Sequence, residues 1–112
     1  MNKREELIVK YAFDLKEKFD IDADMDLLRK IAIGLGPSIY NPDSSTVSSS
    51  DASELERVKH NFLIKKLGLN DEPALDQVIA SVIEQYGRTN RSKYRVVVYY
   101  LLTKYFGKEA AY

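Results

Sequence analysis

The sequence contains no cysteine and no tryptophan, and it has only one histidine, His60. Without cysteine the chain cannot form a disulfide-stabilised scaffold, a thiolate metal site or a cysteine nucleophile. A single histidine excludes a multi-histidine metal centre and a pair of histidines acting as acid and base. His60 also lies off the apolar stripe of its segment, so we interpret it as a surface residue. We therefore expect neither a metal nor a cofactor.

Glycine and proline are scarce, with five and three residues in a chain of 112. Hydrophobic residues make up 45% and charged residues 30%, a composition typical of a folded chain and not of a disordered one. The length fits a single domain over residues 1–112. Charged residues interrupt the N-terminal segment, and no run approaches the roughly 18 apolar residues of a membrane span. We expect a cytoplasmic protein that does not bind membranes.

Apolar residues recur at intervals of three and four in five segments, which is typical of amphipathic helices. Most of these segments begin at an aspartate or asparagine that can cap a helix, or end at a glycine. The predicted helices cover about 2–19, the residues from Asp24 to 34–37, 51–67, the residues from Asn70 to Gly87, and the residues after Asn90. The sequence therefore predicts an all-α fold, a single compact domain of about five helices.

Two of these helices carry specific start signals. Asp51 is followed three positions later by Glu54, which is the spacing of a capping box, where each side chain binds the other residue's backbone N–H. Pro73 lies in the first turn of the fourth helix, where its missing N–H costs nothing, and Asn70 is the predicted cap.

The fifth helix is apolar nearly all round, so we expect it to be the central and most buried element. Its predicted main face comprises Tyr94, Val97, Val98, Leu101, Leu102 and Tyr105. Residues 95–100 are also rich in β-branched and aromatic side chains, which favour a strand. The rest of the chain offers no partner strand, and a lone strand would leave its backbone groups unpaired, so a helix is preferred.

Two motifs that could carry chemistry fail on spacing. Residues 20–26 begin like a calcium-binding EF-hand loop, but Met25 and Ile31 occupy the positions that require glycine and glutamate. The glycines at 34 and 36 lack the third glycine and the preceding strand of a dinucleotide-binding fingerprint. No nucleophile, base and orienting group assemble either, so the sequence indicates no catalytic residues and favours a protein that is not an enzyme.

The charges are unevenly distributed along a chain whose net charge is zero. Residues 1–56 contain seven basic and twelve acidic side chains, a net charge of −5, and residues 57–112 contain ten and five, a net charge of +5. This asymmetry favours pairing of the two halves within one chain or with a second copy, and it also fits an anionic partner.

Four cations cluster around the turn before the fifth helix, and they are Arg88, Arg91, Lys93 and Arg95. Arginine binds phosphate with two hydrogen bonds, and the neighbouring Tyr86 and Tyr94 could stack on bases. This cluster therefore supports an alternative function, weak binding of RNA or single-stranded DNA. Against it, the tyrosines fall at core spacing, and the isoelectric point of about 6.6 is far below that of a typical nucleic-acid binder.

The connection over residues 37–50 is long for a compact domain, and such loops are often functional or disordered. Its first part contains two large apolar side chains, Ile39 and Tyr40, which we expect to dock on the core because leaving both in water would forgo several kcal/mol of burial. The candidate functional loop comprises Pro37, Ser38, Ile39, Tyr40 and Asn41. Residues 44–50 offer only Val47 for burial, so we expect nothing but the cap at Asp51 to hold them.

Three strings carry a resemblance to a known family: GLGPSIYNPD (34–43), SDASELERVKHNFLIKKLGL (50–69) and NRSKYRVVVYYLLTKYFGK (90–108). Together they resemble the small bacterial family known as domain of unknown function 2853, over nearly the whole chain. The resemblance implies a bacterial, cytosolic, all-helical domain, and it supplies no catalytic residues. We therefore expect a non-catalytic protein-interaction module, whose partner is a second copy of the chain or another protein.

Overall fold

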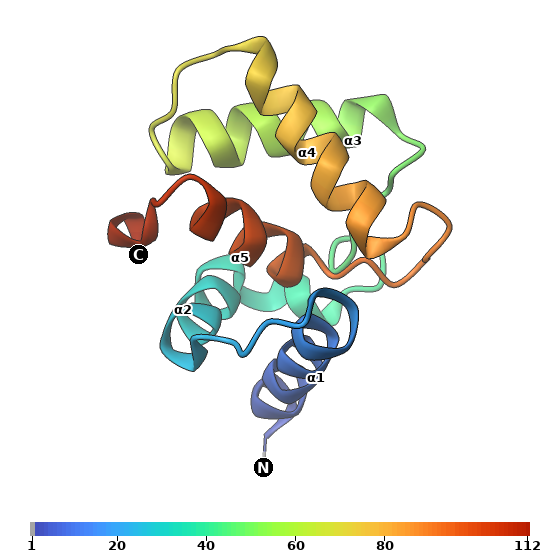
Figure 1. Ribbon diagram of the computed structural model, residues 1–112. Helices are drawn as coiled ribbons and strands as arrows, with labels where there is room; N and C mark the ends of the chain where they lie inside the picture. Colours follow the sequence, from blue (N-terminus) through green and yellow to red (C-terminus); the bar gives the residue numbers. More distant parts are fainter. Residues whose placement is uncertain (1) are drawn as a thin grey trace.

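A computed structural model describes residues 2–112, and helices dominate it (Figure 1). The α-helices within that range are α1 (Lys3–Phe19), α2 (Met25–Leu35), α3 (Ala52–Arg57), α4 (Pro73–Tyr86) and α5 (Arg95–Tyr105). Short 3-10 helices cover Gly36–Tyr40 (η1) and Glu109–Ala111 (η3), and a π-helix (η2) covers Val58–Lys66. The only β-type pairing among the described residues is an isolated bridge between Thr46 and Tyr94. The predicted all-α fold is confirmed, and residues 95–100 form a helix.

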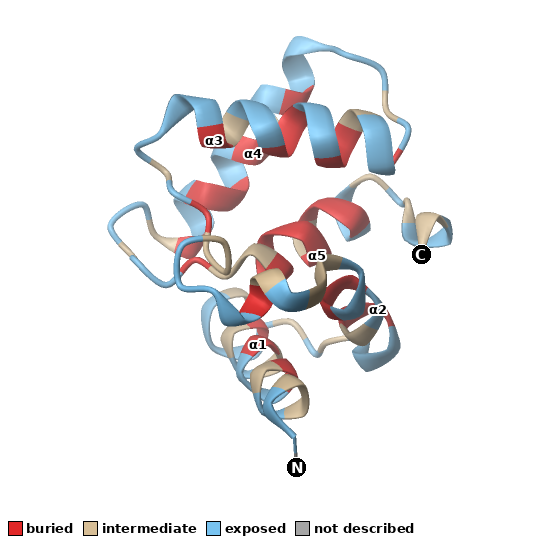
Figure 2. Cartoon of the chain, turned by 180° about the vertical axis from the view of Figure 1, so that it is seen from behind, coloured by how far each residue is buried: buried red, intermediate tan, exposed pale blue. Residues whose placement is uncertain are grey.

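Helix α5 lies at the centre of the molecule, between α4 on one side and α1 and α2 on the other (Figure 1). Seven of its eleven residues are buried (Figure 2). They are Val96, Val97, Val98, Tyr99, Tyr100, Leu102 and Thr103. The predicted apolar face is wrong at Tyr105, which is 68% exposed. Neighbours cover α5 on several sides, so Val96, Tyr99 and Tyr100 are buried although they lie off the predicted face. Tyr105, in contrast, lies on the uncovered side of the last turn, which also contains the buried Leu102 and Thr103.

Local capping signals set the starts of three helices. The side-chain oxygens of Asn2, Asp24 and Asp51 each accept a backbone N–H from the first turn of α1, α2 and α3. The predicted cap of the fourth helix is wrong, because α4 begins at Pro73 and Glu72 precedes it without a side-chain cap. A residue before proline is pushed into extended backbone, and Glu72 adopts φ −140° and ψ 150°, so the helix cannot begin earlier.

The third predicted helix has the expected length but changes its winding within it. Its first turns are α-helical, and the remainder is the π-helix η2, where Phe62 packs flat on Tyr99 with ring centroids 3.8 Å apart. Lys59 of η2 is buried, and its ammonium nitrogen lies 3.0 Å from a carboxylate oxygen of Asp71 and 3.0 Å from one of Asp76. These two ion pairs fasten η2 to the start of α4. Within the described residues, no helix has the length and apolar character needed to cross a membrane.

A buried tyrosine makes stability depend on pH. Burial raises the pKa of Tyr11 to about 12, and the nearby Tyr94 and Tyr40 add to the shift. In the unfolded chain this pKa is about 10. The contribution of Tyr11 to the free energy of unfolding is therefore complete below pH 10 and is lost as the pH rises towards 12. We expect the urea concentration at the midpoint of denaturation to decrease as the pH rises from about 10 to about 12. In the Tyr11→Phe variant this decrease should be smaller. An equally steep fall in the variant would contradict this assignment.

Candidate functional site

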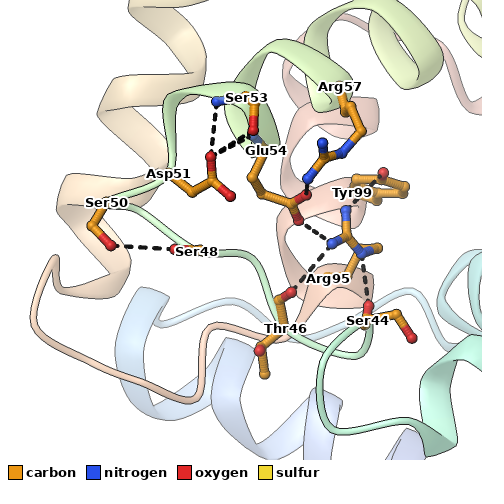
Figure 3. A network of polar contacts seen from close by, with 10 residues as sticks. All are labelled: Ser44, Thr46, Ser48, Ser50, Asp51, Ser53, Glu54, Arg57, Arg95 and Tyr99. Atoms are coloured by element: carbon orange, nitrogen blue, oxygen red, sulfur yellow. Dashed lines mark hydrogen bonds and ion pairs between the residues drawn. The ribbon is translucent and has the colours of Figure 1, made fainter.

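Arg95, one of the four predicted patch residues, is an internal crosslink and not a surface cation (Figure 3). Its guanidinium forms an ion pair with Glu54, and the two side chains are only 12% and 10% exposed. The same guanidinium donates to the carbonyl oxygens of Ser44, at 2.8 Å, and Thr46, at 3.2 Å. Because these bonds and one to the Tyr99 hydroxyl occupy it, Arg95 is not available to bind a nucleic acid.

Glu54 therefore does not complete the predicted capping box. The Asp51 carboxylate does cap α3, accepting the backbone N–H of Ser53 at 3.0 Å and that of Glu54 at 3.4 Å. The Glu54 carboxylate, however, turns towards Arg95 and also accepts from Arg57 at 2.9 Å. The predicted bond from the Glu54 carboxylate to the backbone N–H of Asp51 is therefore wrong, because the carboxylate forms a buried ion pair with the distant Arg95 instead.

The serine-rich segment 44–50 is attached along its length, so the expectation that only Asp51 holds it is wrong. The backbone carbonyl of Ser45 accepts the backbone N–H of Arg95 at 2.8 Å, and the backbone N–H of Val47 donates to the backbone carbonyl of Lys93 at 2.8 Å. The Val47 side chain is buried, and the Ser49 hydroxyl donates to the carbonyl of Arg88 at 3.0 Å. The partners lie some 40 to 50 residues away along the chain, and a local sequence pattern carries no signal for them.

Lys93, a second member of the predicted patch, is also internal. Its residue is only 3% exposed, and its ammonium group donates to the carbonyl oxygens of Arg88, at 3.2 Å, and Asn90. Burial, followed by the positive charge of Arg88, lowers the pKa of Lys93. None of the ion pairs found between described residues gives this ammonium a carboxylate partner within 4 Å. Lys93 is thus a buried cation without a counter-charge.

The remaining two members of the patch, Arg88 and Arg91, are exposed. Arg88 pairs with Glu84 of α4 at 3.0 Å, an exposed ion pair that contributes little to stability. Together with Lys93 and residues 46–50, these two arginines line an open pocket of about 410 Å³. The structure thus brings three of the four predicted cations to one pocket and removes Arg95 from it.

The predicted functional loop 37–41 forms the short helix η1 and the residue after it. Ile39 is buried, as expected, but Tyr40 is 41% exposed. The expected docking of Tyr40 is wrong, because its ring lies at the surface with the ammonium of Lys3 5.7 Å from its centroid. The Ser38 hydroxyl donates to the carbonyl of Leu35 at 2.8 Å, which ties η1 to the end of α2.

This loop lines a mainly apolar groove of about 240 Å³ between α1, α2 and η1. Its lining comprises Arg4, Ala32, Ile33, Gly36, Pro37, Ile39 and Tyr40. Ile33 is 51% exposed, and the Nε atom of Arg4 is buried without a hydrogen-bond partner. Neither Ile33 nor Arg4 was predicted to be a site residue. The available signal for Ile33 was its position off the buried stripe of α2, where a large apolar side chain has no structural use.

The described part of the chain, residues 2–112, contains no cluster of three or more histidine, aspartate or glutamate side chains suited to hold a metal ion. His60 is a surface residue, as predicted, and its Nε2 atom lies 3.0 Å from a carboxylate oxygen of Glu56, four residues earlier in α3. An exposed i,i+4 contact of this kind stabilises a helix by about 0.2–0.5 kcal/mol.

The sequence matches the model of a family described as a protein of unknown function (DUF2853). The match covers residues 10–110 and so includes the groove-lining loop, the serine-rich segment and the whole of α5. No curated protein matches the chain. The chain therefore belongs to this family of unknown function, DUF2853.

Proposed function

We propose that this protein is a non-catalytic interaction module that binds a segment of another protein in the groove between α1, α2 and η1. The observation that carries the proposal is that Ile33 and Tyr40, two exposed large apolar side chains, both line one mainly apolar groove. Exposed apolar side chains that gather around a concavity are typical of interaction sites, whereas single exposed apolar residues are ordinary.

The size of the groove favours a peptide segment over a free metabolite. At about 240 Å³ it is smaller than the usual range of small-molecule sites, which begins at about 300 Å³. It can accept one or two large side chains. Burying an aliphatic or aromatic side chain there would contribute about 1.5–3 kcal/mol before the costs of association.

The charges at the rim favour a carboxylate next to that apolar side chain. Lys3 lies over the Tyr40 ring, and Arg4 lines the groove with a buried Nε atom that has no acceptor. The nearby Glu5 accepts from Arg29 at 2.7 Å through one carboxylate oxygen, which lowers its pKa, and the charge of Arg4 adds to this shift, but no hydrogen bond joins Glu5 to Arg4. A carboxylate beside the Arg4 guanidinium would form charge-assisted hydrogen bonds. The proposed ligand is therefore a peptide in which a large apolar residue adjoins an aspartate or glutamate.

Selection of short displayed peptides against the full chain tests this proposal. We expect enrichment of sequences with a large apolar residue next to an acidic one, and loss of their binding in the Ile33→Glu variant. The matched control is Val9→Glu on α1, because Val9 is 53% exposed and Ile33 is 51% exposed. Both positions are exposed, so both variants should keep the stability of the original chain within about 0.5 kcal/mol.

Three outcomes would overturn the proposal. The first is the absence of any enriched sequence. The second is an equal loss of binding in the Val9→Glu and Ile33→Glu variants. The third is a concentration-dependent dimer that the Ile33→Glu substitution dissociates, since the groove would then be occupied by a second copy of the chain.

The alternative function, binding of RNA or single-stranded DNA, receives less support from the geometry. It relied on a surface of four cations, and two of them, Lys93 and Arg95, are internal. Arg88 is paired with Glu84, which leaves Arg91 as the patch arginine without an ion pair among those found in residues 2–112. A nucleic-acid site usually neutralises several phosphates along a stripe of basic side chains.

A further inference from the structure

The buried, uncompensated ammonium of Lys93 requires a physical explanation. Taking a lysine charge out of water costs several kcal/mol unless a counter-charge or hydrogen bonds replace the water. Two carbonyl oxygens accept from Lys93, those of Arg88 and Asn90, and an ammonium group has three N–H donors. One N–H donor therefore has no acceptor among the hydrogen bonds of the described residues, and no carboxylate lies within 4 Å to balance the charge.

The pocket beside Lys93 has the chemistry of an anion site. One wall is the serine segment, with the hydroxyls of Ser48 and Ser50 exposed, and the other wall is the turn that carries Arg88 and Arg91. The Ser48 and Ser50 hydroxyls lie 3.4 Å apart and are bonded only to each other among the hydrogen bonds of the described residues (Figure 3). No aspartate or glutamate lines this pocket.

We propose that this pocket binds a phosphoryl group, either as inorganic phosphate or as a small phosphomonoester. A phosphoryl dianion offers several acceptor oxygens, which match the donors of Lys93, Arg91 and the two serine hydroxyls. Arginine pairs with phosphate through parallel N–H bonds, and charge-assisted bonds are the stronger class. A carboxylate has fewer acceptor sites and lower charge. This site shares no lining residue with the groove of the proposed function, so the two stand independently.

Titration with inorganic phosphate at constant ionic strength tests the site, with the backbone amide signals of the full chain followed by NMR. We expect saturable shifts confined to residues 46–50 and 88–93, with a Kd of about 1 mM or tighter. A parallel titration with glycerol 3-phosphate distinguishes the source of the phosphoryl group. Tighter binding of the ester assigns the site to phosphomonoesters, and tighter binding of phosphate assigns it to the free anion.

The variants Arg91→Gln and Ser50→Ala are the informative ones, because both side chains are exposed and neither has a structural partner outside the pocket. We expect Arg91→Gln to weaken binding about tenfold and Ser50→Ala to weaken it severalfold. Lys93→Met is expected to abolish binding, but it also removes bonds that hold the 88–90 turn, so the exposed variants carry the test. Lys65→Gln, an exposed cation on η2, is the control and should leave the Kd unchanged.

Three results would overturn the proposal: no saturable shift with either probe, the same shifts with sodium chloride alone, or equal effects of Arg91→Gln and Lys65→Gln. The Ile33→Glu variant should bind phosphate as the unmodified chain does, which separates a failure of this site from a failure of the groove.

Discussion

Replacing Arg95 with methionine is expected to lower the free energy of unfolding by about 3 kcal/mol. The substitution leaves the buried Glu54 carboxylate with only the exposed Arg57 as a partner, and it frees the carbonyl oxygens of Ser44 and Thr46. Breaking a buried ion pair costs about 3–5 kcal/mol, and the remaining contact with Arg57 places the expected value at the lower end. Urea denaturation followed by circular dichroism measures the change.

The Arg91→Met variant is the matched control for Arg95→Met, because Arg91 is an exposed member of the same stretch. It should change stability by no more than about 0.5 kcal/mol. Adding Glu54→Met to Arg95→Met should recover the part of the loss that comes from the unpaired carboxylate, since an apolar pair often replaces a buried ion pair without cost, while the carbonyl oxygens of Ser44 and Thr46 stay without this donor. If Arg95→Met and Arg91→Met have equal effects, the crosslink between α5, α3 and the serine segment does not stabilise the fold.

Replacing Leu102 with alanine is expected to cost about 2–5 kcal/mol, because its side chain is fully buried in the central helix and its removal leaves a cavity. Tyr105→Ala, three residues further along the same helix, provides the comparison. Tyr105 is the most exposed of the large hydrophobic residues described, so its loss should change stability by about 0.5 kcal/mol or less. A small effect at Leu102 would contradict the central position of α5.

The helices could be predicted from the sequence because their signals are local. Asn2, Asp24 and Asp51 cap the first turns of the helices that follow them, and the apolar spacing of α1, α2 and α4 repeats every three or four residues. The same holds for the central position of α5, since a helix that is apolar nearly all round can be stable only when other elements cover it.

The candidate sites could be predicted only in part, because their decisive contacts join residues far apart in the chain. Four cations within eight residues predict a surface patch, but the burial of Lys93 and Arg95 depends on Ser44, Thr46 and Glu54 from another segment. The opposite charges of the two halves favour pairing between them. Two ion pairs do join the halves, one between Arg95 and Glu54 and one between Lys104 and Asp24. The local sequence pattern does not indicate which cation pairs with which carboxylate.

The groove shows a similar division. The loop between Pro37 and Pro42 was predicted as a functional region, but both Ile39 and Tyr40 were expected to be buried, and only Ile39 is. Whether a tyrosine docks or remains at the surface depends on neighbours such as Lys3 and Ile33, which α1 and α2 bring to the loop only in the folded chain.

Calorimetric titration of a selected peptide into the full chain and its variants tests the proposed interaction most directly. Loss of an apolar contact worth about 1.5–3 kcal/mol corresponds to a decrease in affinity of about tenfold or more for Ile33→Glu. For Val9→Glu, with nearly the same exposure and an identical charge change, we expect an affinity within about twofold of the original. Equal affinities for the Ile33→Glu variant and the unmodified chain would show that the groove does not bind the peptide.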